Sequence, residues 1–216
     1  MKKMLIIGIC LLFASAALQA QEPDAKFVKA MEKALSGMDT LKTEEQWLAA
    51  SNKFERIAQK ESKEWLPTYY VAFCQIMAFN MSQDPVKQEL FAKNAEANIH
   101  KADEMSPNNS EIYVLKSMIS GLFIRLNPMV NGQKYAPVAG MQLEKAKKLD
   151  PSNPRADMQE GITQFFTPPQ WGGSKEKGKK LMESAREKYT AFQPASPIHP
   201  TWGNKMNEIV LEMVNK

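Results

Sequence analysis

Apolar side chains recur along most of the chain at intervals of three and four residues, the spacing that places them on one face of an α-helix. No stretch keeps the strict alternation of apolar and polar residues that is typical of a β-strand. The pattern therefore predicts an all-α protein of about nine helices with mostly short connections. The expected helices cover residues 25–38, 43–62, 66–81, 85–105, 110–126, 135–149, 154–166, 174–192 and 203–215.

Capping residues mark the ends of these helices. Thr43, followed three residues later by Gln46, forms a capping box ahead of an apolar stretch. Further caps, several with a proline in the first turn, are predicted at Ser82 or Asp84, at Asn109 or Ser110, at Ser152 or Asn153, and at Ser174.

The amino terminus has the composition of a secretory signal peptide. Lys2 and Lys3 precede an uncharged apolar run over residues 4–18. A transmembrane helix needs about 18 or more apolar residues, so this run suits a signal core better than a membrane span. Small residues then lead into a polar segment, which predicts cleavage after Ala20 or, alternatively, after Ala17. We expect an exported, periplasmic protein with no membrane span after signal removal.

The mature chain would keep a single cysteine, Cys74, inside an apolar run. One cysteine cannot form an internal disulfide, so the fold must rest on its apolar core, in which Cys74 is expected to be inert. The domain organisation predicted is a signal peptide at 1–20, a helical repeat domain at 21–192, and a proline-rich segment with a last helix at 193–216.

Two stretches of the chain repeat each other with an offset of 44 residues. The first contains Ala95, Ile99, Ala102, Pro107 and Asn109, and the second contains Ala139, Leu143, Ala146, Pro151 and Asn153. Alanines let paired helices approach closely, a large apolar residue fills the space between units, and the proline cannot extend the helix.

This arrangement resembles the end of a unit in the tetratricopeptide-repeat (TPR) family. The family's unit is about 34 residues long, so the extra residues here are expected in a loop over 127–133, between the two helices of one unit. The resemblance implies a superhelix of stacked helical hairpins whose concave surface is lined by the first helix of each unit.

Composition argues against several other functions. The formal net charge of +4 is small for a nucleic-acid-binding protein of this size. No nucleophile with an adjacent base and no credible metal-ligand cluster stands out, so we expect no enzyme activity, no metal and no cofactor. The loop around Trp171 reads as a rigid turn whose indole tucks into the array.

The TPR resemblance implies a set of groove-lining residues and hence a function. The family's lining positions fall on Tyr69, Phe73, Glu111, Val114, Met118, Arg155, Met158 and Ile162, with His199, Trp202 and Trp171 as second-rank candidates. The main expectation is a scaffold that binds a protein or peptide partner in its concave groove. The alternative is a small-ligand receptor or enzyme with a pocket between the array and the C-terminal segment, and homo-oligomerisation stays open.

Overall fold

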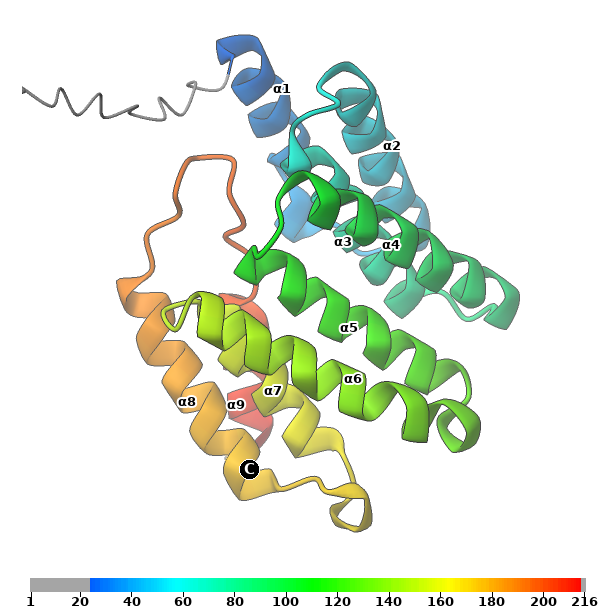
Figure 1. Cartoon of the computed structure of the whole chain (residues 1–216), viewed down its shortest axis with the longest axis vertical. Helices are drawn as coiled ribbons and strands as arrows, with labels where there is room; N and C mark the ends of the chain where they lie inside the picture. Colours follow the sequence, from blue (N-terminus) through cyan, green and yellow to red (C-terminus); the bar gives the residue numbers. More distant parts are fainter. Residues whose placement is uncertain (1–23, 215–216) are drawn as a thin grey trace, which may run out of the picture.

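The computed structural model describes residues 24–214, so the predicted signal peptide lies outside the described residues. Within that range the chain forms helices and no strand, which confirms the all-α class. The α-helices, labelled in Figure 1, are α1 (Ala25–Leu35), α2 (Glu44–Lys60), α3 (Trp65–Met81), α4 (Pro85–Met105), α5 (Ser110–Leu126), α6 (Pro128–Leu149), α7 (Pro154–Phe166), α8 (Lys175–Ala191) and α9 (Asn204–Val214). Two short 3-10 turns, η1 (Met38–Thr40) and η2 (Pro169–Trp171), lie between them.

The helix ends follow the predicted capping residues. The reciprocal capping box between Thr43 and Gln46 is confirmed at the start of α2. The side chains of Asp84, Asn109, Asn153 and Ser174 cap α4, α5, α7 and α8. The first helix is shorter than expected, because Gly37 adopts a left-handed conformation (φ 78°) that interrupts it before η1.

Consecutive helices pack as hairpins. The most extensive contacts join α2 to α3, α3 to α4, α5 to α6 and α7 to α8. Figure 1 shows α5 and α6 running side by side. Contacts between α6 and α7 are much sparser, so these two helices are only loosely packed against each other. The arrangement agrees with stacked hairpins, while membership of the TPR family stays a prediction.

The repeated alanines are contact points within this array. Ala102 of α4 and Ala146 of α6 are each 0% exposed. The Ser110 hydroxyl at the start of α5 donates to the carbonyl oxygen of Ala146 at 2.9 Å, and the Asn153 amide donates to Ser110 Oγ at 3.0 Å. The end of one unit is therefore joined to the start of the next through a backbone approach that a small side chain permits.

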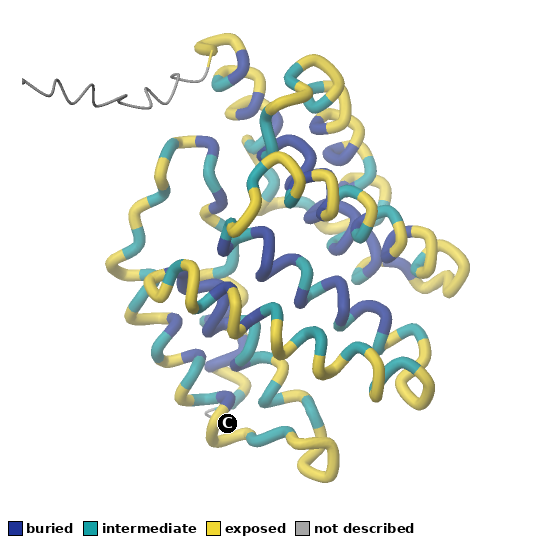
Figure 2. Tube along the Cα trace, viewed as in Figure 1, coloured by how far each residue is buried: buried dark blue, intermediate teal, exposed yellow. Residues whose placement is uncertain are grey.

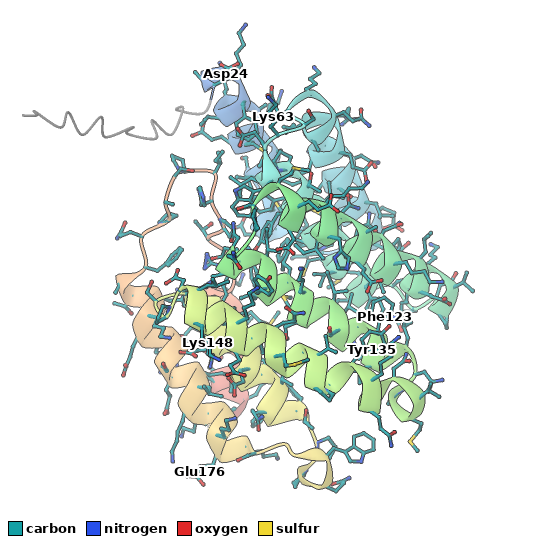
Figure 3. The ribbon with its side chains drawn as sticks, viewed as in Figure 1. Asp24, Lys63, Phe123, Tyr135, Lys148 and Glu176 are labelled. Atoms are coloured by element: carbon teal, nitrogen blue, oxygen red, sulfur yellow. The ribbon has the colours of Figure 1, made fainter. Side chains whose placement is uncertain are left out.

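The loop expected over residues 127–133 is wrong: this stretch forms the first turns of α6. Asn127 caps the helix by accepting from the Val130 N–H, and Pro128 occupies a position where its missing N–H costs nothing. Tyr135 then stacks on Phe123 of α5 with ring centroids 4.9 Å apart, and Figure 3 labels the pair. The extra residues of the unit therefore extend its second helix, α6, which packs against α5, and they do not form a longer loop.

The centre of the molecule is α3. Almost every residue from Leu66 to Phe79 is buried, including Cys74, whose burial raises the pKa of its thiol and leaves it inert. Figure 2 shows that α5 is also largely buried, whereas much of α6 and α8 is exposed. A helix that is apolar on all sides is suited to a position surrounded by other helices.

Replacing Ala102 or Ala146 with leucine should overpack the joint between units. We expect either variant to lower the free energy of unfolding by about 1–3 kcal/mol, because the fully buried methyl groups leave no room for a larger side chain. Urea denaturation measures this. The exposed Ala97→Leu substitution on α4 is the control, and unchanged midpoints in both core variants would contradict the packing described.

Candidate functional site

A large groove runs along one side of the array. Its volume is about 2080 Å³, and it is lined by residues from α3, α5, α6, α7, α9 and the segment before α9. Helices distant in sequence therefore share one concave surface. This groove is the candidate functional site.

Apolar side chains make up most of the groove wall. Phe73 of α3, Met118 and Leu122 of α5, and Met158 and Ile162 of α7 all line it. Phe73 and Met158 are nearly buried, whereas Met118 and Ile162 are partly exposed. Such a surface binds chiefly by removing apolar area from water, which favours a largely apolar ligand.

The α6 wall of the groove contains a row of small residues. Gly132, Ala136, Ala139 and Gly140 all line it. A Cβ atom added at Gly132 or Gly140 would meet no other atom within 4 Å, and the same is true of Gly121 on the neighbouring helix α5. These glycines are not required by close helix packing, so they leave free space that a flat ligand can use.

The proline-rich segment 192–203, which we call the strap, forms one end of the groove. It leaves α8, extends toward the start of α5 and turns back into α9 (Figure 1). Two hydrogen bonds connect it to α3: the Tyr70 hydroxyl donates to the Ile198 carbonyl at 3.4 Å, and the Trp202 indole donates to Tyr69 Oη at 3.0 Å. The Trp202 ring also packs on Phe73, with centroids 4.8 Å apart.

Arg155 of α7 connects the strap to the helical array. Its side chain is 0% exposed, its Nε donates to Glu111 Oε2 at 2.9 Å, and its Nη2 donates to the Pro200 carbonyl. The guanidinium also lies over the rings of Phe192 and Trp202, with Cζ 4.6 and 5.5 Å from their centroids. Burial alone would lower the pKa of Arg155, but the Glu111 carboxylate, with smaller contributions from Tyr69 and Tyr189, more than offsets burial and raises the pKa.

The structure divides the predicted lining residues into two groups. Phe73, Met118, Met158 and Ile162 do line the groove. Tyr69 and Val114 are each 0% exposed and belong to the core.

Glu111 and Arg155, the charged residues expected to line the groove, instead bind each other inside the protein. Arg155 is buried beneath the strap, and Glu111 faces it and a smaller pocket of about 370 Å³ on the other side of the strap. The expectation that Arg155 grips a partner's carboxylate is therefore wrong, because Glu111 already occupies that role inside the protein. Helical spacing alone does not distinguish the open face of a helix from the face that contacts the next unit.

The second-rank residues also line the groove. Trp202 and His199 come from the strap, and Trp171 from η2. Trp171 is 62% exposed, so the expectation that it tucks into the array is wrong. The His199 Nδ1 lies 2.7 Å from Ser196 Oγ, and its ring packs edge-on against Trp65. Burial, with a smaller contribution from the Arg155 charge, lowers the pKa of His199, so the ring is neutral at pH 7.

Sequence reasoning missed the contribution of α6. The TPR resemblance assigns the concave surface to the first helix of each unit, whereas α6 is a second helix. The signal that was present is the run of small residues at 132, 136, 139 and 140, whose spacing of three to four places them on one helix face. Such a face also suits close helix packing, so the sequence alone did not reveal that it is open.

The fold and the groove together define an all-α helical array with an apolar groove, a form suited to holding a small organic ligand. No protein-family model matches the chain, and no curated protein matches it. Among solved structures, the chain is similar to the HusA haemophore from Porphyromonas gingivalis, with a TM-score of 0.78 and 28% sequence identity. The match covers 87% of this chain and 92% of that chain.

This likeness overturns the expectation of a polypeptide-binding scaffold. The matched protein is a haemophore, which points to small-ligand binding. The alternative expectation, a pocket between the array and the C-terminal segment, agrees better with the structure, because strap residues line the groove. Within residues 24–214, no helix has the length and apolarity needed to cross a bilayer.

Arg155→Ala should destabilise the fold strongly. Removing the guanidinium leaves the Glu111 carboxylate buried without its partner and the strap without its contact to α7, so we expect a loss of about 3–5 kcal/mol. Urea denaturation of Arg155→Ala beside Arg186→Ala measures it. The exposed Arg186–Glu208 pair should be worth about 0–1 kcal/mol, and equal losses in both variants would contradict the role given to Arg155.

His199 should make stability depend on pH. The unfolded chain has a histidine pKa of about 6.5, and the folded value is lower, so the unfolded state binds more protons as the pH falls through 6.5. We expect the melting temperature to fall between pH 7.5 and 5, and to fall less in His199→Gln. A thermal melt series on both proteins measures this, and parallel curves would contradict it.

Proposed function

We propose that the chain binds a haem-like tetrapyrrole in the apolar groove and acts as an exported carrier, with no catalytic step. The observation that carries the proposal is the likeness to a haemophore over 87% of the chain at 28% identity. The ligand would be cargo, so the proposal does not make it a resident cofactor.

The chemistry of the groove supports this ligand class. A tetrapyrrole is a flat, mostly apolar ring with carboxylates at one edge, and flat ligands need two extended walls. Small residues on α6, such as Gly140, and apolar side chains on α7, such as Ile162, offer two such walls. Met118, Met158 and His199 also line the groove, and thioether and imidazole groups are the kinds that ligate haem iron.

One ligand is expected to fill only part of the groove. At about 2080 Å³ the groove exceeds the range of about 300–1,000 Å³ that is usual for a small-molecule pocket, so one ligand fills only part of it. The part between α5, α6 and α7 is favoured. There α7 makes only sparse contacts with α5 and α6, and Gly121 and Gly140 leave free space.

Export follows from a separate observation. The charged start and the short apolar run over residues 4–18 support a cleaved signal peptide. A carrier that collects its ligand outside the cytoplasm needs such a signal, and we propose the periplasm as the compartment.

Haem titration tests the proposal directly. Binding should move the Soret band of haem and quench the emission of tryptophans that line the groove, such as Trp202. Metal-free protoporphyrin should also bind if apolar contact supplies most of the affinity, and any difference between the two ligands measures the contribution of the iron. An unchanged haem spectrum with unquenched fluorescence would contradict the proposal.

A groove-filling variant links the binding to this site. Gly121→Phe places a ring in the free space beside Met118 and should weaken haem binding by more than about tenfold. Gly121→Ala is the matched control, because it makes the same backbone change and leaves most of the space open. Both variants should melt at or above the wild-type temperature, since glycine within a helix is destabilising. Wild-type affinity in Gly121→Phe would place the ligand elsewhere.

A further inference from the structure

Arg125 is a cation at the edge of the groove that two neighbouring residues hold in place. It lies near the end of α5, and its Nη1 donates to Asn80 Oδ1 of α3 at 2.6 Å. The guanidinium lies over the Phe79 ring, with Cζ 4.9 Å from the ring centroid. Both Arg125 and Asn80 line the groove, so α3 positions this charge beside the apolar wall.

The other cations that line the groove differ in their partners. Lys147 lies 2.6 Å from both Asp157 and Glu160, and Lys177 lies 2.8 Å from Glu160. These lysines are neutralised within the protein. Lys205, on α9, is exposed and has neither an ion pair nor a hydrogen bond among the described residues.

Arg125 is unusual because it is both oriented and unpaired. No carboxylate from residues 24–214 lies within 4.0 Å of its guanidinium, and its contacts are a neutral amide and an aromatic ring. Arg125 is exposed to solvent at the groove edge, and loss of some water around its guanidinium lowers its pKa, with no acidic neighbour to oppose that shift. An oriented cation without a counter-ion is stabilised when a ligand supplies one, because a charge-assisted hydrogen bond forms without the cost of ordering the side chain.

The geometry of the side chain indicates which anion fits. Asn80 uses Nη1, which leaves the edge formed by Nε and Nη2 without a partner in the described structure. Two parallel N–H groups of this kind match the two oxygens of a carboxylate.

We propose that Arg125, held by Asn80 and Phe79, binds a carboxylate of the groove ligand and so selects acidic ligands over their neutral analogues. This rests on the proposed function, because it assumes that the groove holds a tetrapyrrole. It adds a specificity that apolar contact alone does not supply.

The test compares protoporphyrin with its dimethyl ester, both presented in the same buffer with mild detergent. The ester has the same ring but no carboxylate charge. We expect the wild type to bind the acid more tightly by about tenfold, as a charge-assisted hydrogen bond to an oriented guanidinium allows. Arg125→Gln should lose that preference by weakening binding of the acid and leaving binding of the ester unchanged.

Arg186→Gln is the matched control. It removes the same charge from an exposed ion pair that does not line the groove, and it should keep the wild-type preference. Circular-dichroism melts of both variants check that the fold is intact.

Two negative results have different meanings. If the wild type binds acid and ester equally, or if Arg125→Gln keeps the preference, the Arg125 proposal alone is overturned. If the wild type binds neither porphyrin, the Arg125 proposal is overturned, and if haem also leaves its spectrum unchanged, the proposed function fails with it.

Discussion

The buried Arg155 charge is the constraint on which the closed end of the groove depends. A guanidinium that is 0% exposed needs partners inside the protein: Glu111 accepts from its Nε and the strap carbonyl of Pro200 accepts from its Nη2, whereas Nη1 has no hydrogen-bond partner among the described residues. The acid comes from α5, the arginine from α7 and the carbonyl from the strap. One charge therefore fixes the relative positions of three segments that are far apart in sequence.

The composition of the strap explains how it can lie along the array without the regular backbone hydrogen bonds of a helix or sheet. Pro194, Pro197 and Pro200 have no N–H groups, so the segment has few donors to leave unsatisfied. Its carbonyl oxygens accept from side chains instead: Ile198 from Tyr70, Pro200 from Arg155, and Trp202 from Tyr189 at 3.2 Å. An extended, proline-rich segment thus becomes a fixed wall of the groove.

The groove itself results from uneven packing between hairpins. Contacts are dense within each hairpin and sparse between α6 and α7. The small residues of α6 line the groove, and Gly132 and Gly140 leave space in it. Two kinds of contact are then available to a ligand: apolar area from residues such as Met118 and Ile162, and the oriented charge of Arg125 near the far end of α5.

The sequence by itself determined the helices, their caps and the joints between units. These depend on local spacing and on small residues such as Ala102 and Ala146, whose role can be read without knowing the partner helix. It also identified the proline-rich segment after α8 and the last helix that follows it. The extra residues of α6 were misplaced, because stacking of Tyr135 on Phe123 is a contact between helices.

Only the tertiary structure decided which faces are open. Met118 lines the groove and Val114, one turn earlier on the same helix, is buried in the core, although both are apolar. Arg155 suited a binding site by residue type, yet Glu111 and Pro200 enclose it. Arg125 was not considered from sequence at all, because its orientation comes from Asn80 and Phe79 about 45 residues earlier in the chain. Helical periodicity reports that a side chain is apolar or charged, whereas its neighbours on other helices determine whether it packs, pairs or stays free to bind.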